Sequence, residues 1–196
     1  MTKTAEFFFD VGSPASYLAW TQMPDLCAQA GATLVYKPML LGGVFQATGN
    51  ASPATVAAKG RYMVVDLGRF AKRYGVDFRM NPHFPINTLQ LMRGLIGMQV
   101  RQPARFDAFL GALFTALWAR GANLNDPAAT ASMLVGAGFD PVEVFALAND
   151  ADIKAALKAN TEEAVARGVF GAPTVLVGDA MFFGQDRLDF IREALA

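Results

Sequence analysis

The sequence contains little of the chemistry that cross-links small domains or holds metal ions. It has one cysteine, Cys27, and one histidine, His83, among 196 residues. A single cysteine excludes an internal disulfide framework, and one cysteine with one histidine argues against a zinc site. No loop has carboxylates spaced as metal ligands, so we predict no metal. Because Cys27 shares a predicted helical face with Met23, Leu26 and Ala30, we expect its thiol to be buried and inert.

The chain also lacks a net charge and a long apolar run. Lysine plus arginine equals aspartate plus glutamate at 17 each, without a basic block, which argues against nucleic acid or an anionic membrane as a partner. Lys3, Glu6 and Asp10 interrupt any signal-peptide core, and the longest apolar helical run, 109–119, is too short to span a bilayer. We therefore expect a soluble cytoplasmic protein whose partner is a small molecule.

The sequence does have strand patterns at both ends and helical patterns between them. Its 53% hydrophobic content is sufficient for the core of one domain. The first strand, helix and second strand predict a parallel pair with a right-handed crossover. Helical spacing of apolar residues prevails from Thr55 to Gly168, after which strands return. The predicted strands are 6–10, 33–37, 174–177 and 181–183, and the predicted helices are 14–30, 63–74, 106–117, 127–137, 141–148, 152–167 and one from about 187.

Two short motifs stand beside the first and third predicted strands, namely Ser13-Pro14-Ala15-Ser16 and Gly171-Ala172-Pro173-Thr174. In thioredoxin-like redox proteins, Cys-x-x-Cys follows the first strand and a cis-proline loop lies beside it. Here serines stand at both cysteine positions, so a reactive sulfur must come from a ligand, for which glutathione is the obvious candidate. A hydroxyl at a helix N-terminus can donate a hydrogen bond to a thiolate, and the helix dipole favours that charge. The alternative is that Ser13 only caps the helix.

Five motifs occur in order along the chain: Phe9-Asp10-Val11-Gly12-Ser13-Pro14-Ala15-Ser16-Tyr17-Leu18, Thr48-Gly49-Asn50, Lys59-Gly60-Arg61-Tyr62-Met63, Phe170-Gly171-Ala172-Pro173-Thr174 and Phe183-Gly184-Gln185-Asp186-Arg187. With them the sequence resembles, over essentially its whole length, the 2-hydroxychromene-2-carboxylate isomerases, relatives of kappa-class glutathione transferases and DsbA-type oxidoreductases. The resemblance implies an α/β, thioredoxin-like fold: one DsbA-like domain over 1–196, with an all-helical insertion at about 40–168 between a βαβ half and a ββα half. It also implies a homodimer.

The resemblance implies a role for several side chains. Ser13 would be the catalytic hydroxyl, with Ala172 and a cis Pro173 presenting backbone to glutathione. The γ-glutamyl end would be held by Gln185 and Asp186. We also expect Asp186 to cap the last helix, and Ser16 to satisfy backbone groups without contacting substrate. The remaining implied contacts are Asn50 and Lys59 for glutathione, with Lys59 at the glycyl carboxylate, and Phe84 and Asn87 for the second substrate. Trp118, at the end of an apolar helical stripe, is a candidate wall of the aromatic site, with a place in the core as the alternative.

The implied activity is a glutathione-dependent isomerisation of 2-hydroxychromene-2-carboxylate to trans-o-hydroxybenzylidenepyruvate in naphthalene-type catabolism. Two alternatives stay open at this point. The first is a kappa-like glutathione transferase or peroxidase, which would consume glutathione. The second is a non-catalytic thioredoxin-fold module that binds peptides or thiols, which would bind tightly without turnover. Whether His83 takes part as an acid or base is open as well.

Overall fold

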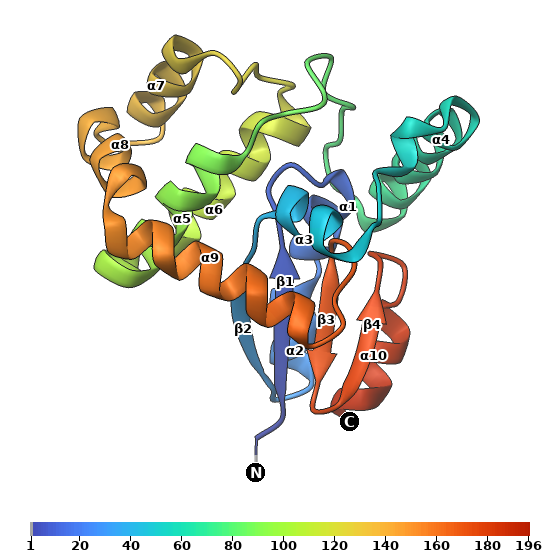
Figure 1. Ribbon diagram of the computed structural model, residues 1–196. Coiled ribbons are helices and arrows are strands. Elements are labelled where there is room, and N and C mark those ends of the chain that lie inside the picture. Colours follow the sequence, from blue (N-terminus) through green and yellow to red (C-terminus); the bar gives the residue numbers. More distant parts are fainter. Residues whose placement is uncertain (1) are drawn as a thin grey trace.

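The sheet is assembled from both ends of the chain. The computed structural model describes residues 2–196. Its sheet has the order β2-β1-β3-β4, with β1 parallel to β2 and antiparallel to β3, and β3 antiparallel to β4 (Figure 1). The predicted strands and the parallel first pair are therefore confirmed. The strands are β1 (Thr4–Phe9), β2 (Thr33–Pro38), β3 (Thr174–Val177) and β4 (Ala180–Phe183).

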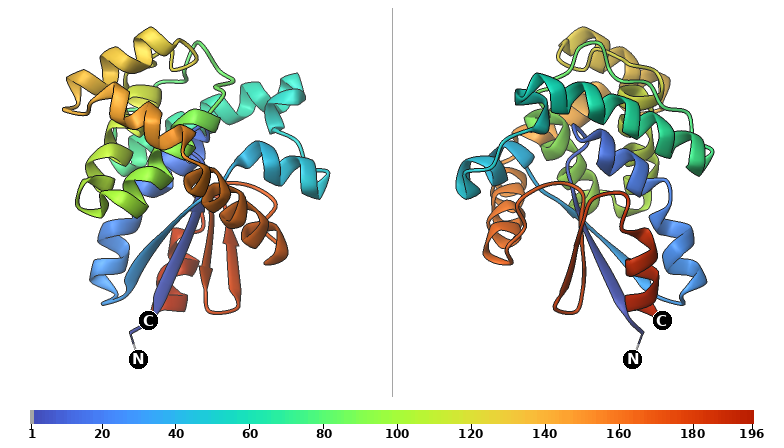
Figure 2. Two further views of the ribbon diagram at one scale, coloured as in Figure 1. Left: turned by 60° about the vertical axis from the view of Figure 1, so that its left-hand side comes forward. Right: turned by 90° about the vertical axis from the view of Figure 1, so that its right-hand side faces the viewer.

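The segment between β2 and β3 is helical wherever it has regular structure. Helices α5 to α8 gather on one side of the molecule and α4 lies on the other, while α9 returns across the sheet (Figures 1 and 2). In residues 2–196, no helix is both long and apolar enough to cross a membrane. The helices are α1 (Pro14–Trp20), α2 (Met23–Gln29), α3 (Leu41–Thr48), α4 (Ala57–Tyr74), α5 (Leu89–Arg101), α6 (Phe106–Phe114), α7 (Pro127–Gly136), α8 (Pro141–Asn149), α9 (Ala151–Ala166) and α10 (Leu188–Leu195), with 3-10 turns η1 (Pro53–Thr55) and η2 (Pro103–Arg105) and a π-helical turn η3 (Thr115–Ala119).

The central strand β1 is buried on both faces. Successive side chains of a strand point to opposite sides of the sheet. Phe7 and Phe9 stack with ring centroids 5.1 Å apart in the main core, which includes Cys27, whereas Phe8 packs in a second cluster with Ala164 of α9. All three phenylalanines are fully buried, and Cys27 is buried as predicted. The run of three phenylalanines therefore marks a strand covered by helices on both sides.

The helix predicted over 14–30 is two helices, α1 and α2. The prediction overlooked Pro24, which lies in the first turn of α2. Proline has no N–H to donate, and its ring clashes with the carbonyl four residues earlier, so a continuous helix would break at this point. The chain turns at Thr21 and Gln22 instead, and α2 ends before Gly31, which has a φ of +62°.

Two helices, α3 and α5, were not predicted. Glycines weaken a helical pattern, and α3 contains Gly42 and Gly43 while α5 contains Gly94 and Gly97. In α5 the glycines permit close packing, because a Cβ at Gly97 would lie 2.8 Å from Cβ of Leu147 on α8. The residues that weaken the sequence signal for α5 are thus the residues that let it pack against α8.

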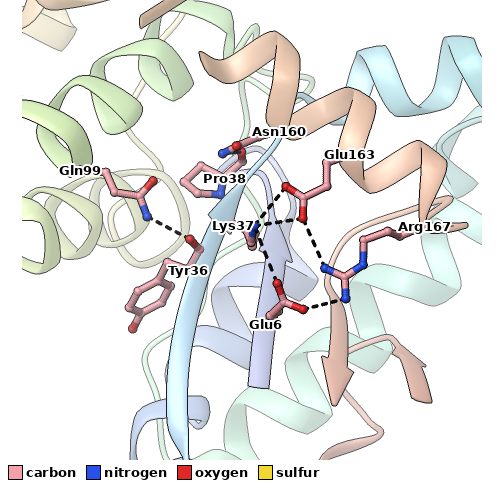
Figure 3. Close-up of polar contacts among 8 residues, drawn as sticks. All are labelled: Glu6, Tyr36, Lys37, Pro38, Gln99, Asn160, Glu163 and Arg167. Atoms are coloured by element: carbon pink, nitrogen blue, oxygen red, sulfur yellow. Dashed lines mark hydrogen bonds and ion pairs between the residues drawn. The ribbon is translucent and has the colours of Figure 1, made fainter. Parts of the chain in front are cut away.

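A polar cluster fixes α9 across β1 and β2 (Figure 3). Glu6 lies 2.7 Å from Arg167 and 3.7 Å from Lys37, and both cations also pair with Glu163, at 3.3 Å and 3.0 Å. The hydrogen bond from Arg167 lowers the pKa of the Glu6 carboxyl below its ordinary 4.5. Asn160 adds a hydrogen bond from its side-chain N–H to the carbonyl of β2's last residue. The cluster thus anchors the helix that leads into β3.

Candidate active site

Ser13 lies where the two halves of the sheet meet. The chain turns after β1 through a hydrogen bond from Ser13 N–H to the Asp10 carbonyl, and Pro14 begins α1. Ser13 Oγ accepts a hydrogen bond from Ser16 N–H at 3.1 Å and lies 3.0 Å from the Ala172 carbonyl, to which it donates. The side chain therefore caps α1, which was the alternative to a catalytic role. Its hydroxyl proton also points to the Gly171-Ala172-Pro173-Thr174 motif. Ser13 is only 5% exposed.

The loop of the second motif presents its backbone to Ser13. The peptide bond between Ala172 and Pro173 is cis, as predicted. Thr174 Oγ1 donates to the Gly171 carbonyl at 2.9 Å, and Gly184 N–H donates to the Pro173 carbonyl at 3.0 Å. These bonds fix the loop between β3 and the turn after β4. That Ala172 pairs with an extended peptide stays a prediction.

A buried carboxylate that sequence reasoning missed holds the Ser13 turn. Asp10 is 2% exposed and accepts hydrogen bonds from Gly12 N–H at 2.9 Å, from Leu41 N–H at 2.8 Å and from Thr88 Oγ1 at 3.1 Å. Burial raises the pKa of the Asp10 carboxyl, against the effect of these donors. Asp10 thus joins the turn to the first residue of α3 and to the start of α5. The only sequence signal was a carboxylate directly after an apolar strand.

The insertion also supports the turn through Trp118. The indole N–H of Trp118 donates to the Val11 carbonyl at 2.7 Å, and Val11 N–H points at the sulfur of Met92 at 3.4 Å. Trp118 is fully buried, so in this structure it lies behind the turn and offers no surface to a substrate, contrary to its expected place as a wall of the aromatic site. Phe84 packs on it with ring centroids 6.3 Å apart and is partly exposed.

The loop that carries Asn87 is fixed by amide side chains. Asn87 N–H donates to Asn125 Oδ1 at 2.8 Å, and Asn87 Oδ1 accepts from Leu89 N–H at 3.2 Å. Asn125 in turn donates to the His83 carbonyl. Asn87 is exposed and borders a cavity of about 260 Å³ between α5, α7 and α8. Among the described residues that line this cavity there is none from the Ser13 turn or the cis-proline loop.

Asn50 contacts the segment that enters the cis-proline loop, whereas Lys59 lies farther along the chain on α4. Asn50 Nδ2 donates to the Phe170 carbonyl at 2.8 Å, which ties the end of α3 to that loop. Lys59 belongs to the first turn of α4 and lines a shallow pocket of about 440 Å³ with Tyr62 and Asp66. Both side chains are exposed. The structure therefore brings Asn50 to the loop, and no described contact joins Lys59 to it.

Gln185 and Asp186 follow β4 and differ in burial. Gln185 is 6% exposed, and its carbonyl accepts a hydrogen bond from the Tyr74 hydroxyl at 2.8 Å. Burial raises the pKa of Tyr74 to about 12, so this donor keeps its proton near neutrality. Asp186 pairs with Arg187 at 2.7 Å. The expected cap on α10 is wrong, because Arg187 occupies the N-cap position and no side chain caps the helix.

Two buried polar atoms near these motifs have no partner among residues 2–196, Ser16 Oγ and Gln185 Oε1. Ser16 is fully buried on the first turn of α1. The prediction that its hydroxyl would bind backbone groups is wrong, because the hydroxyl has no partner among the described residues. A buried polar atom without a hydrogen bond is costly, so such atoms mark places where a ligand can bind. Within the same described range, no group of three histidine, cysteine, aspartate or glutamate side chains could hold a metal.

Comparison with known proteins identifies the family. Residues 4–196 match the family model of the DSBA-like thioredoxin domain. The chain is 31% identical to a 2-hydroxychromene-2-carboxylate isomerase of Sphingobium xenophagum, covering 100% of this chain and 99% of that protein. It is 28% identical to glutathione S-transferase kappa 2 of Caenorhabditis elegans, covering 99% and 92%.

Among solved structures, the chain matches a 2-hydroxychromene-2-carboxylate isomerase with a TM-score of 0.86 and 28% identity, covering 98% of this chain and 94% of that one. The thioredoxin-like α/β fold with helices between its two halves is therefore confirmed. The chain belongs to the DsbA-like thioredoxin family and, within it, to the family of the 2-hydroxychromene-2-carboxylate isomerases.

Proposed function

We propose that the protein is a glutathione-dependent isomerase that converts 2-hydroxychromene-2-carboxylate to trans-o-hydroxybenzylidenepyruvate. The observation that carries this proposal is the position of Ser13 Oγ, between the first-turn amide of α1 and the Ala172 carbonyl. This is where a redox thioredoxin has its first cysteine, so the site is built for sulfur and a ligand must supply it. The names of the relatives supply the substrate class and the reaction type.

The residues around Ser13 fit glutathione. Its extended cysteinyl unit would pair with the Ala172 backbone. Gln185 Oε1, which has no partner in the described chain, would accept an N–H of the γ-glutamyl end, and the Asp186 carboxylate would pair with its ammonium. Lys59 and Asn50, both exposed, would bind the glycyl carboxylate.

Bound glutathione would supply a thiolate that adds to a conjugated double bond, permits rotation about the resulting single bond and then leaves, so that it is not consumed. Ser13 would turn its O–H from the Ala172 carbonyl to the sulfur. The N-terminus of α1 would favour the negative charge. Because Asp10 and Trp118 already hold the turn, little reorganisation would be needed when charge develops there. We propose Phe84 and Asn87 as contacts for the aromatic carboxylate.

A kappa-type transferase is the second candidate, because kappa transferases match over nearly the full chain at 25–28% identity. It would join glutathione to an electrophile and release the adduct as product. The homodimer and the cytoplasmic location stay predictions in either case.

Turnover with substoichiometric glutathione separates these functions. The isomerase should convert many equivalents of the chromene acid per glutathione and leave the glutathione unchanged at the end. Consumption of glutathione in proportion to an electrophilic aryl halide, without isomerisation, would support the transferase. Tight glutathione or peptide binding with neither activity would support a binding module.

Ser13→Ala should lower kcat/KM for the isomerisation by about 100-fold, as the loss of one preorganised donor does in other enzymes. The matched control is Asp140→Ala, because Asp140 also caps a helix outside the proposed site, with Oδ1 accepting from Val142 N–H at 2.9 Å. The control should keep wild-type kcat/KM. Near-wild-type turnover of Ser13→Ala at saturating glutathione would remove Ser13 from the reaction.

A further inference from the structure

A groove beside α9 takes no part in the proposed reaction. It lies between α3, α5 and α9 and has a volume of about 770 Å³, within the range of small-molecule sites. Its apolar lining includes Leu40, Ala47, Leu89, Leu157 and Val165. None of the expected glutathione contacts is among the described residues that line it.

The rim of this groove is cationic. Arg93 of α5 and Lys154 and Lys158 of α9 line it, and Glu162 is the single acidic residue among the described lining residues. Glu162 already pairs with Lys158 at 3.5 Å, and both of these side chains are mostly exposed. Two positive charges, on Arg93 and Lys154, are thus left without balance at the rim.

Arg93 and Lys154 are both partly buried, and within residues 2–196 the side chain of neither makes a hydrogen bond or ion pair. Arg167, directly after the end of α9, provides a contrast. Arg167 is partly buried too, and it pairs with Glu6 and Glu163. A cation that loses part of its water without gaining a carboxylate is unfavourable, and a bound anion would correct this.

We propose that the groove binds a small amphipathic carboxylate, with its apolar body on Leu89 and Leu157 and its carboxylate between Arg93 and Lys154. The apolar lining excludes a bare inorganic anion as the best ligand, and the two unbalanced cations exclude a neutral hydrocarbon. This site is separate from the proposed glutathione site. Two of its lining residues, Leu40 and Leu89, are sequence neighbours of Leu41 and Thr88, the donors to Asp10.

The test is a titration of the full chain with 1-naphthoate, followed by methyl NMR, in the absence of glutathione. The shifts should concentrate on the methyl groups of Leu89, Leu157 and Val165. Octanoate tests whether an aliphatic body serves equally well, and neutral 1-naphthamide should bind at least about 10-fold more weakly, as the loss of a charge-assisted hydrogen bond implies.

Arg93→Gln and Lys154→Gln should each weaken 1-naphthoate binding by about 5- to 10-fold, whereas Lys72→Gln, on the exposed face of α4, should not change it. Two variants are used so that the result does not depend on the folding of either one alone. Shifts confined to the Ser13 turn, or unchanged binding in both groove variants, would overturn the proposal. The assay contains no glutathione and measures no turnover. Failure of the groove proposal would therefore not affect the proposed isomerase activity, and failure of the isomerase proposal would not affect the groove proposal.

Discussion

The two sides of the candidate site are built differently. The Ser13 turn, residues 10–13, is buried, and its polar groups are bound by side chains or backbone from α3, α5, η3 and the loop of Ala172. The glutathione arm, residues 50–59, is exposed at most positions, and its one hydrogen bond to the cis-proline loop comes from Asn50. The part that would stabilise charge is fixed before a ligand binds, and the part that would hold the ligand's far end stands open to solvent.

This difference indicates that the helical insertion holds the Ser13 turn in place. A thioredoxin sheet alone supplies the strand, the helix N-terminus and the proline loop. Here Asp10 and Trp118 connect the turn to α3 and η3 of the insertion. Preorganised groups stabilise developing charge without reorganisation, so we expect changes in the turn to cost more than changes in the arm.

The largest effect on stability should come from Asp10→Asn. An amide has one acceptor oxygen, whereas the carboxylate has two. Either Gly12 N–H or Leu41 N–H would therefore become a buried donor without an acceptor. We expect the free energy of unfolding to fall by about 2 kcal/mol, measured by urea denaturation.

Asp140→Asn is the matched control for this change. Asp140 caps α8 from an exposed position, accepting from Val142 N–H at 2.9 Å, and asparagine caps about as well, so the loss should stay within about 0.5 kcal/mol. Equal losses in the two variants would mean that Asp10 does not hold the turn.

A smaller effect, confined to stability, should follow from Glu6→Gln in the cluster beneath α9. The pKa of Glu6 is lowered in the folded protein, so its contribution to stability is present above 4.5 and is lost as the pH falls through the folded value. The difference in unfolding free energy between wild type and variant should be about 1 kcal/mol near neutrality and should shrink in acid. Urea denaturation over a pH series measures it.

The isomerase kcat/KM of Glu6→Gln should equal that of the wild type, because Glu6 lies in β1 and not in the Ser13 turn. Two results would contradict the claim that the polar cluster under α9 serves stability alone. One is a stability difference that stays constant at all pH values, and the other is impaired turnover.

The smallest effect should come from Lys59→Gln in the arm. Loss of one exposed charge should raise the KM for glutathione by about 3-fold and leave kcat unchanged, since the interaction is the same in ground and transition states. Lys72→Gln on the same helix serves as the control and should change neither constant. A fall in kcat would show that the arm takes part in the chemical step, and the comparison between the two sides would fail.

The sequence predicted the parts of the fold that local patterns encode. The run Phe7-Phe8-Phe9 predicted the first strand, and the Ala172-Pro173 motif predicted the cis bond. Resemblance to a family then connected Ser13 with that loop, and the structure places Ser13 Oγ 3.0 Å from the Ala172 carbonyl.

The parts that could not be predicted depend on contacts between distant segments. Asp10 is defined by donors at positions 41 and 88, and no local pattern marks a carboxylate that three segments will bury. Helix α5 was missed because Gly97, which weakens the pattern, serves packing on α8. The aromatic ring of Trp118 was recognised, but its burial and its bond to Val11 follow from tertiary structure alone.

The central claim is that Ser13 stabilises a thiolate that belongs to a ligand. The most direct test is a pH titration of the thiolate absorbance of bound glutathione in the Cys27→Ser protein, compared with the same protein carrying Ser13→Ala. Cys27 is removed so that only the ligand's thiol reports. We expect a midpoint clearly below the free-thiol value of about 8.5 with Ser13 present, and a midpoint at least about one unit higher in Ser13→Ala. The same midpoint in both proteins would contradict the claim.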